Sequence, residues 1–161
     1  MARITKPYTN RELTTEDLDT LRQALTILYI NKGYINSGAV IPDQPVENGV
    51  IQLKIIEGEL TAIEVKGNKW FSDSFIKKRI ALGTDKPLNL NSLQERLQLL
   101  QQNQLIERLY SVLKPGLLPG QSVLQVEVEE QQPVIIQLGF DNYQSPTVGA
   151  EEGWVTVAHR N

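Results

Sequence analysis

The side chains able to do acid–base or nucleophilic chemistry are few and lie far apart. The sequence contains one histidine, His159, and no cysteine. A catalytic histidine needs a nucleophile or proton donor within hydrogen-bond reach, and none is paired with His159 by a recognised spacing. We interpret His159 as a solvent-facing or strand-pairing residue. No catalytic residue and no metal ligand is predicted, and thiol chemistry is excluded.

The carboxylates lie at the ends of strand-like stretches and do not converge. Glu57 and Glu59 end one stretch, and Glu129 and Glu130 end another. We interpret all four as solvated strand ends. No glycine-rich loop has the spacing of a phosphate-binding motif, so the sequence predicts no enzyme and no cofactor. A small hydrolase is the competing class, and turnover that disappears in His159→Ala would support it.

The composition narrows the class of partner. Hydrophobic residues make up 40% of the sequence and charged residues 22%, which is typical of a globular protein. The net charge of -3 and the lack of a Lys/Arg run argue against nucleic acid or anionic lipid as the main partner. No apolar run approaches the roughly 20 residues of a membrane-spanning helix.

The sequence contains an internal repeat of one structural unit. The alternating stretch that begins at Val50 returns at Val123, and Pro42 precedes Pro115 by the same interval. Leucine-striped helices precede both stretches. Ordered likeness of this kind predicts two copies of one unit, and chance likeness between amphipathic elements is the alternative.

The second copy is the more complete. It predicts a strand at 60–66, a short helix capped by Ser72, a longer helix capped by Asn91, and strands at 106–114 and 122–130. Its order is strand, helix, helix, strand, strand.

The first copy supplies only the end of that order. It predicts a helix that Thr14 caps and Gly33 ends, followed by strands within 34–42 and at 50–57.

Aromatic side chains divide between the core and the surface. Trp70 and Phe71 lie between a turn and a helix cap, where aromatic residues usually pack a helix onto a sheet. A ligand platform is the alternative. Tyr110 lies on the face opposite Leu109 and Leu113 and is expected to point away from the helices.

The C-terminal residues follow a different pattern. Val134, Ile136, Leu138 and Phe140 share one face of a predicted strand, and residues 153–161 can pair back onto it. This alternation is typical of one strand of a membrane barrel, and an ordinary hairpin shows it too.

A family resemblance emerges from these stretches. The segment LTTEDLDTLRQALTILYINKGYINSGAVIPDQPVENGVIQLKIIEGELTAIEVKGN resembles the polypeptide-transport-associated (POTRA) domains of two-partner secretion transporters, outer-membrane proteins that export one large adhesin or cytolysin. LKPGLLPGQSVLQVEVEEQQP is similar to the end of the second POTRA domain. QLGFDNYQSPTVGAEEG resembles the first barrel strand and its turn, where Asp141-Asn142 matches the family and Thr147-Val148-Gly149 departs from it.

The resemblance implies an α+β fold of tandem POTRA modules. Each complete module is a three-stranded mixed sheet packed against two helices. Residues 1–58 would be the C-terminal part of the first module, 59–132 the second module, and 133–161 the truncated start of a transmembrane β-barrel. The first module would lack its opening strand and most of its first helix, and would borrow a strand or be partly disordered. These domains would lie on the periplasmic side of the outer membrane.

The resemblance also implies a binding site. The family places the second strand of a module at the sheet edge, where an unfolded secreted protein, adhesin-like or hemolysin-like, can add itself as a strand. The expected contact residues are Arg108, Tyr110, Val112 and Lys114, and a proline at Tyr110 is expected to remove an amide from that edge. An edge covered by its neighbours is the alternative structure. A barrel assembly factor, whose clients are nascent barrel proteins, is the alternative function.

Overall fold

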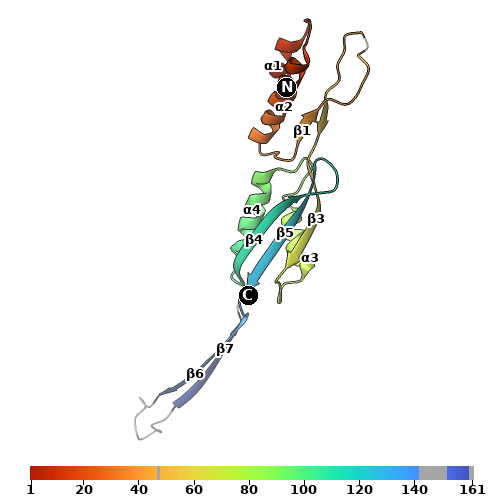
Figure 1. Ribbon diagram of the computed structural model, residues 1–161. Helices are drawn as coiled ribbons and strands as arrows, with labels where there is room; N and C mark the ends of the chain where they lie inside the picture. Colours follow the sequence, from red (N-terminus) through yellow and green to blue (C-terminus); the bar gives the residue numbers. More distant parts are fainter. Residues whose placement is uncertain (47, 142–151, 160–161) are drawn as a thin grey trace.

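The chain forms an elongated molecule that ends in a projecting hairpin (Figure 1). The computed structural model describes residues 1–46, 48–141 and 152–159. The helical elements are α1 (Ala2–Thr5), the 3₁₀ helix η1 (Lys6–Tyr8), α2 (Thr15–Asn31), α3 (Asp73–Ala81) and α4 (Leu90–Gln101). The strands are β1 (Gly38–Val40), β2 (Lys54–Ile56), β3 (Glu59–Lys66), β4 (Ile106–Pro115), β5 (Gln121–Glu130), β6 (Val134–Asp141) and β7 (Glu152–His159).

The strands form separate sheets along the molecule. The largest has the order β3-β5-β4, with β3 parallel and β4 antiparallel to β5. Strands β1 and β2 form an antiparallel pair, as do β6 and β7. The predicted α+β fold with a three-stranded mixed sheet is confirmed. Its central strand is β5, which holds both neighbours in place.

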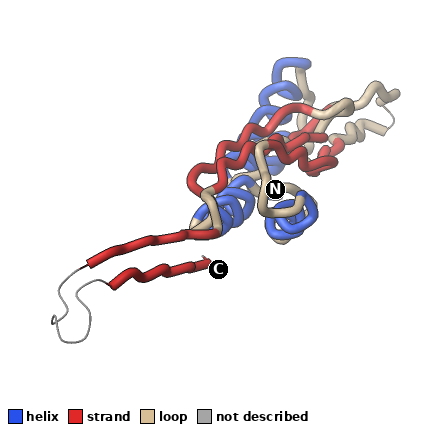
Figure 2. The backbone as a smooth tube through the Cα atoms, turned by 90° about the horizontal axis from the view of Figure 1, so that it is seen from below, coloured by secondary structure: helices blue, strands red, loops and turns tan. Residues whose placement is uncertain are grey.

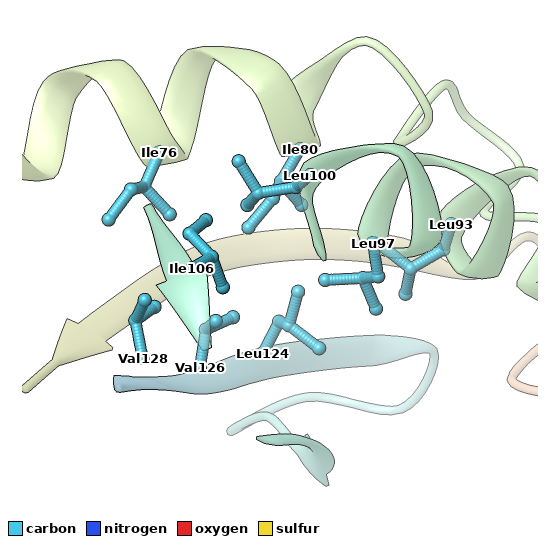
Figure 3. Close-up of a cluster of buried hydrophobic side chains, with 9 residues drawn as sticks. All are labelled: Ile76, Ile80, Leu93, Leu97, Leu100, Ile106, Leu124, Val126 and Val128. Atoms are coloured by element: carbon cyan, nitrogen blue, oxygen red, sulfur yellow. The ribbon is translucent and has the colours of Figure 1, made fainter. Parts of the chain in front are cut away.

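The core of the larger sheet lies between β5 and two helices (Figure 3). Alternate residues of β5 point into it, as the period of a strand requires, and helices α3 and α4 cover it with aliphatic side chains. The buried residues are Ile76, Ile80, Leu93, Leu97, Leu100, Ile106, Leu124, Val126 and Val128.

A smaller core lies under α2. Leu21, Leu25 and Ala39 are buried there, with Leu53 and Ile55 packed against them. In the described part of residues 1–58, two short strands and α2 enclose this cluster, and Ile4 of α1 and Tyr8 of η1 pack against it. The N-terminal unit therefore has less packed structure than the second unit.

Helix α2 begins as predicted at a capping box. The Thr14 hydroxyl accepts a hydrogen bond from the Asp17 N–H (3.1 Å), and the Asp17 carboxylate accepts one from the Thr14 N–H (3.0 Å). Arg11 donates two further hydrogen bonds to Asp17 (2.7 and 3.1 Å). The Arg11 hydrogen bond, followed by that of the Thr14 backbone, holds the pKa of Asp17 well below its usual range.

The predicted cap of α4 is off by two residues. Asn89 is the cap, and its side-chain oxygen accepts a hydrogen bond from the Asn91 N–H (2.9 Å). The Asn89 side chain also donates to the Lys32 carbonyl oxygen (3.0 Å), a contact between distant segments that local sequence does not reveal.

The strand predicted at 50–57 is also shorter than expected. Strand β2 covers only Lys54–Ile56, because its partner β1 is three residues long. Upstream of it, the Gln44 side chain accepts a hydrogen bond from the Gln52 N–H (2.9 Å) and donates one to the Gln52 carbonyl oxygen (2.7 Å). A side chain thus takes the place of a neighbouring strand.

Backbone hydrogen bonds join the β1–β2 sheet to the larger sheet, at a place that we call the junction. The Leu88 N–H donates to the Gly58 carbonyl oxygen (2.7 Å), and the Leu90 N–H donates to the Gly33 carbonyl oxygen (2.8 Å). The Asn36 side-chain amide donates to the Gly120 carbonyl oxygen (2.9 Å). Two main-chain hydrogen bonds and one from a side-chain amide therefore hold the two units together.

The larger core supports a stability prediction on α4. Leu93→Ala should destabilise the fold by about 2–5 kcal/mol, because it opens a cavity in a site that is 1% exposed. Leu99→Ala on the same helix is the matched control, since Leu99 is 49% exposed and its truncation should change stability by less than about 0.5 kcal/mol. Urea unfolding followed by circular dichroism measures both, and equal losses would contradict the assigned core.

Candidate polypeptide-binding edge

Strand β4 is the end strand of the larger sheet and carries the predicted site residues. Leu109 and Leu113 pack against the core. The alternate side chains are exposed on the opposite face of the sheet, as predicted for Tyr110. They are Arg108, Tyr110, Val112 and Lys114. The structure therefore brings the four residues together as one row along one strand.

The backbone of β4 alternates between its neighbour β5 and the open edge. The Gly116 N–H donates to the Gln121 carbonyl oxygen (2.8 Å), which makes these residues a hydrogen-bonded pair. The register is unbroken from this pair to Arg108 opposite Glu129. Because hydrogen-bonded pairs recur at every second residue of an antiparallel ladder, Tyr110 is also bonded to β5.

The outward backbone groups of β4 therefore belong to the intervening residues. Leu109, Ser111 and Leu113 direct their N–H and C=O groups away from β5, toward the side where the sheet ends. The expectation that a proline at Tyr110 removes an amide from the edge is wrong, because that amide pairs within the sheet. Residues whose side chains lie on the face away from the helices alternate along the strand with residues whose backbone amides point outward.

The open edge begins beyond a β-bulge. The register shifts between Ile106 and Arg108, and on the far side of the shift the Gln131 N–H donates to the Leu105 carbonyl oxygen (2.8 Å). An extra residue at a sheet edge twists the strand and interrupts further pairing. The regular part of the edge therefore runs from residue 108 to Pro115.

Charge is arranged along the exposed face of the edge. Arg108 forms an ion pair with Glu129 on the neighbouring strand (3.7 Å). Tyr110, followed by Glu129 and Glu107, raises the pKa of Arg108 above its ordinary value. Between the positive Arg108 and Lys114 lie the apolar surfaces of Tyr110 (51% exposed) and Val112 (55% exposed). An extended peptide laid along β4 would meet apolar contacts at the centre and positive charge at the ends.

The opposite edge of the sheet is less regular. Strand β3 contains a register shift between Leu60 and Ala62. An open, mainly apolar groove of about 360 Å³ separates this strand from α3, with Ile63 and Ala81 on its walls. Of the two edges, β4 offers the longer uninterrupted ladder.

Two residues near the end of β5 depart from the predictions. Glu130 is not a solvated strand end: its carboxylate accepts hydrogen bonds from the N–H groups of Lys69, Trp70 and Phe71 (2.9, 2.5 and 3.2 Å). Phe71 packs against the core and stacks on Phe75 as predicted, with ring centroids 4.8 Å apart. Trp70 does not pack, because the loop held by Glu130 turns it outward, 56% exposed.

Of the other predicted features, some lie within the described residues and some lie outside them. His159 pairs with Val134 in the β6–β7 ladder, which agrees with a strand-pairing role. Asn142 and the segment Thr147-Val148-Gly149 lie outside the described residues. Within the described ranges, no cluster of His, Cys, Asp and Glu has metal-site geometry, and no helix is long and apolar enough to cross a bilayer.

Comparison with known proteins identifies this arrangement. Residues 1–58 match the family model of the ShlB-type POTRA domain. The outer membrane transporter CdiB of Dickeya dadantii is 27% identical over 150 residues, which cover 92% of this chain and 26% of the transporter. The hemolysin transporter protein ShlB of Serratia marcescens is 30% identical over 138 residues, which cover 85% of this chain and 24% of that protein.

A solved structure shows the same fold. CdiB from Escherichia coli aligns with a TM-score of 0.69 and 28% sequence identity, over 93% of this chain and 28% of that one. The chain thus spans about a quarter of the length of the curated relatives.

The names of the relatives indicate where such proteins are located and whether they are transporters or enzymes. The predicted location at the outer membrane agrees with the curated relatives, which include outer membrane transporters. The curated relatives are named as transporters and not as enzymes. By its matched model, its relatives and its fold, the chain belongs to the ShlB-type POTRA domains of two-partner secretion transporters.

Proposed function

We propose that this chain is the client-binding part of a two-partner secretion transporter. Strand β4 takes up a secreted protein as an unfolded polypeptide, which pairs with the outward groups of Leu109, Ser111 and Leu113 and is passed on toward the pore. The observation that carries the proposal is the regular open edge of β4. Added strands gain affinity from main-chain hydrogen bonds, whatever their sequence.

The exposed row beside the edge supplies a loose preference among client segments. Tyr110 and Val112 favour an apolar residue at the centre of the added strand, while Arg108 and Lys114 favour acidic or polar neighbours. One relative is named a hemolysin transporter and another a heme/hemopexin transporter. The first of these names supports a secreted hemolysin-like protein as the client.

The edges on the two sides of the junction have the same polarity. Strand β4 runs toward the junction and ends at Pro115, while β1 begins there at Gly38, paired with Ile56. Asn36 and Ile56 both contact Gly120, which directly precedes β5. The outward Ala39 N–H of β1 already donates to the Thr26 hydroxyl of α2 (3.1 Å), so the free edge that we propose for the client ends at the junction.

The proposed function divides the chain into three parts. Residues 1–58 form the end of one POTRA module, 59–132 a second, and 133–161 the first strands of a barrel. The two separate cores and the junction at Gly58 support the first boundary. The hairpin supports the second, since it leaves the main body after β5 (Figure 2).

The β6–β7 hairpin has the two-faced pattern of a barrel wall. On one face Ile136 pairs with Val157 and Leu138 with Val155, and all four side chains are about two-thirds exposed. On the other face the polar pair of Gln137 and Thr156 lies between Ile135 opposite Ala158 and Gly139 opposite Trp154, so this face is less apolar but not wholly polar. An apolar outer face and a polar inner face are what a membrane barrel requires. We place the apolar face against lipid.

The edge is tested by a proline at its outward amide. Ser111→Pro removes one outward N–H and leaves the β5 ladder intact, because proline is tolerated where the N–H of an edge strand faces solvent. Loss of one hydrogen bond of about 1 kcal/mol should weaken client binding roughly 5-fold. Titration with an unfolded N-terminal fragment of a secreted hemolysin-type protein, followed by NMR, measures the affinity.

The matched control at the same position is Ser111→Ala, which keeps the N–H and should bind as the unchanged chain does. Circular dichroism establishes that both variants are folded. If folded Ser111→Pro and Ser111→Ala bind the fragment equally well, β4 is not the client edge.

Tyr110→Pro should affect stability instead. The Tyr110 N–H pairs with β5 opposite Glu127, so a proline there breaks the ladder and leaves an acceptor unpaired. The expected loss is roughly 1–3 kcal/mol, against a much smaller loss for Ser111→Pro. Urea unfolding of the two variants measures the difference. A larger loss in Ser111→Pro would show that the assigned alternation is inverted.

A further inference from the structure

Trp70 is presented to solvent by an ordered loop. Asn68 fixes this loop from inside, because its side-chain amide donates to the Phe71 carbonyl oxygen (2.9 Å) and to Asp73 (2.9 Å). Glu130 fixes it from outside by accepting the three backbone N–H groups of Lys69, Trp70 and Phe71. The indole is 56% exposed, and no hydrogen bond of its N–H is found among the described residues. A large amphipathic side chain is thus held outward by the fold itself.

The loop lies at the end of the sheet from which the hairpin leaves. Because β3 and β5 are parallel, their C-terminal ends lie together (Figure 1), with Lys66 opposite Glu127. The Glu130 carboxylate bonds to the Trp70 N–H, and β6 begins at Val134. Four residues of extended chain span at most about 14 Å. The Trp70 loop is therefore close to the start of the apolar face of β6–β7.

Lysines flank the indole, and two of the nearby carboxylates, Asp73 and Glu130, are engaged by other groups. Lys66 and Lys69 are exposed, and neither forms an ion pair with another described residue. Asp73 contacts Lys77 (3.5 Å) and Glu130 is used by the loop amides. Glu127 is exposed on the neighbouring strand. The tip of the loop thus combines an indole with positive charge.

We propose that the Trp70 loop docks on phospholipid headgroups at the periplasmic surface of the outer membrane. Trp70 sits at the headgroup level, where tryptophan is enriched in membrane proteins, and Lys66 and Lys69 face lipid phosphates. The inference rests on the proposed function in one respect, which is that the apolar face of β6–β7 lies in the same membrane. The loop then sets how closely the sheet approaches the bilayer.

The client polypeptide is a less suitable occupant for this loop. The loop follows β3, which is at the opposite edge of the sheet from β4, two strand spacings or about 10 Å away. The junction, where β4 ends, lies at the other end of β5. Continuity with the hairpin and the positive charge both favour lipid.

Fluorescence of the full chain tests the contact. Trp154→Phe leaves Trp70 as the one tryptophan, since the sequence has two. On addition of phosphatidylethanolamine–phosphatidylglycerol vesicles, its emission should move to shorter wavelength. Lipids brominated close to the headgroup should quench it more strongly than lipids brominated near the chain end.

The control moves the reporter to the other end of the sheet. The triple variant Trp70→Phe, Trp154→Phe, Leu117→Trp carries its tryptophan on the loop between β4 and β5, where Leu117 is 99% exposed. Its emission should stay unshifted while the chain sediments with vesicles. Unshifted and unquenched Trp70 emission, with or without sedimentation, overturns the proposal. The fluorescence measurement does not involve client binding. Its outcome is therefore independent of whether the Ser111→Pro test supports β4 as the client edge.

The charges are tested separately. Replacing Lys66 and Lys69 with Gln should weaken partitioning into phosphatidylglycerol-containing vesicles by about 5-fold per lysine. Neutral phosphatidylcholine vesicles should show little change. Lys114→Gln, on the client edge, is the matched control and should leave partitioning unchanged. An equal loss in both kinds of vesicle, or in the control, would contradict attraction of the two lysines to the net negative headgroups.

Discussion

The alternating hydrogen bonds of β5 are the constraint on which the other features depend. Its backbone bonds β4 at one residue and β3 at the next, while its side chains alternate between the core and the outer face. This double alternation places Leu124, Val126 and Val128 under the helices. It also commits the Tyr110 amide to the sheet and leaves the Ser111 amide outside. The hydrophobic core, the open edge of β4 and the row of exposed side chains therefore all follow from the register of β5 with its two neighbouring strands.

Local sequence predicted the elements because their signals are local. The Thr14 capping box, the Ser72 cap and the alternation of β5 each lie within a few residues, and all three appear in the structure. The resemblance placed Arg108, Tyr110, Val112 and Lys114 on an edge strand, and β4 does end the sheet. The sequence did not predict which β4 amides bond to β5 and which point outward. This depends on the register between the two strands, which the loop after Gly116 sets.

Contacts between distant residues account for the features that sequence reasoning missed. Glu130 binds amides that precede it by about 60 residues, so its role cannot be inferred from its neighbours. The outward turn of Trp70 follows from that contact. The shift of the α4 cap to Asn89 likewise accompanies a bond to Lys32 across the junction. Periodicity identifies which residues face a core, whereas such bonds fix loops that have no period.

The outward amides of β4 also determine how a polypeptide can move along it. Equivalent hydrogen bonds recur only at every second residue, so a guest strand regains the same bonding after sliding by a dipeptide, about 6.7 Å. Sliding by a single residue turns every guest side chain to the opposite face. Under the proposed function, a client would therefore move over this surface in steps of two residues, and the step length would be set by the geometry of the peptide backbone and not by the client sequence.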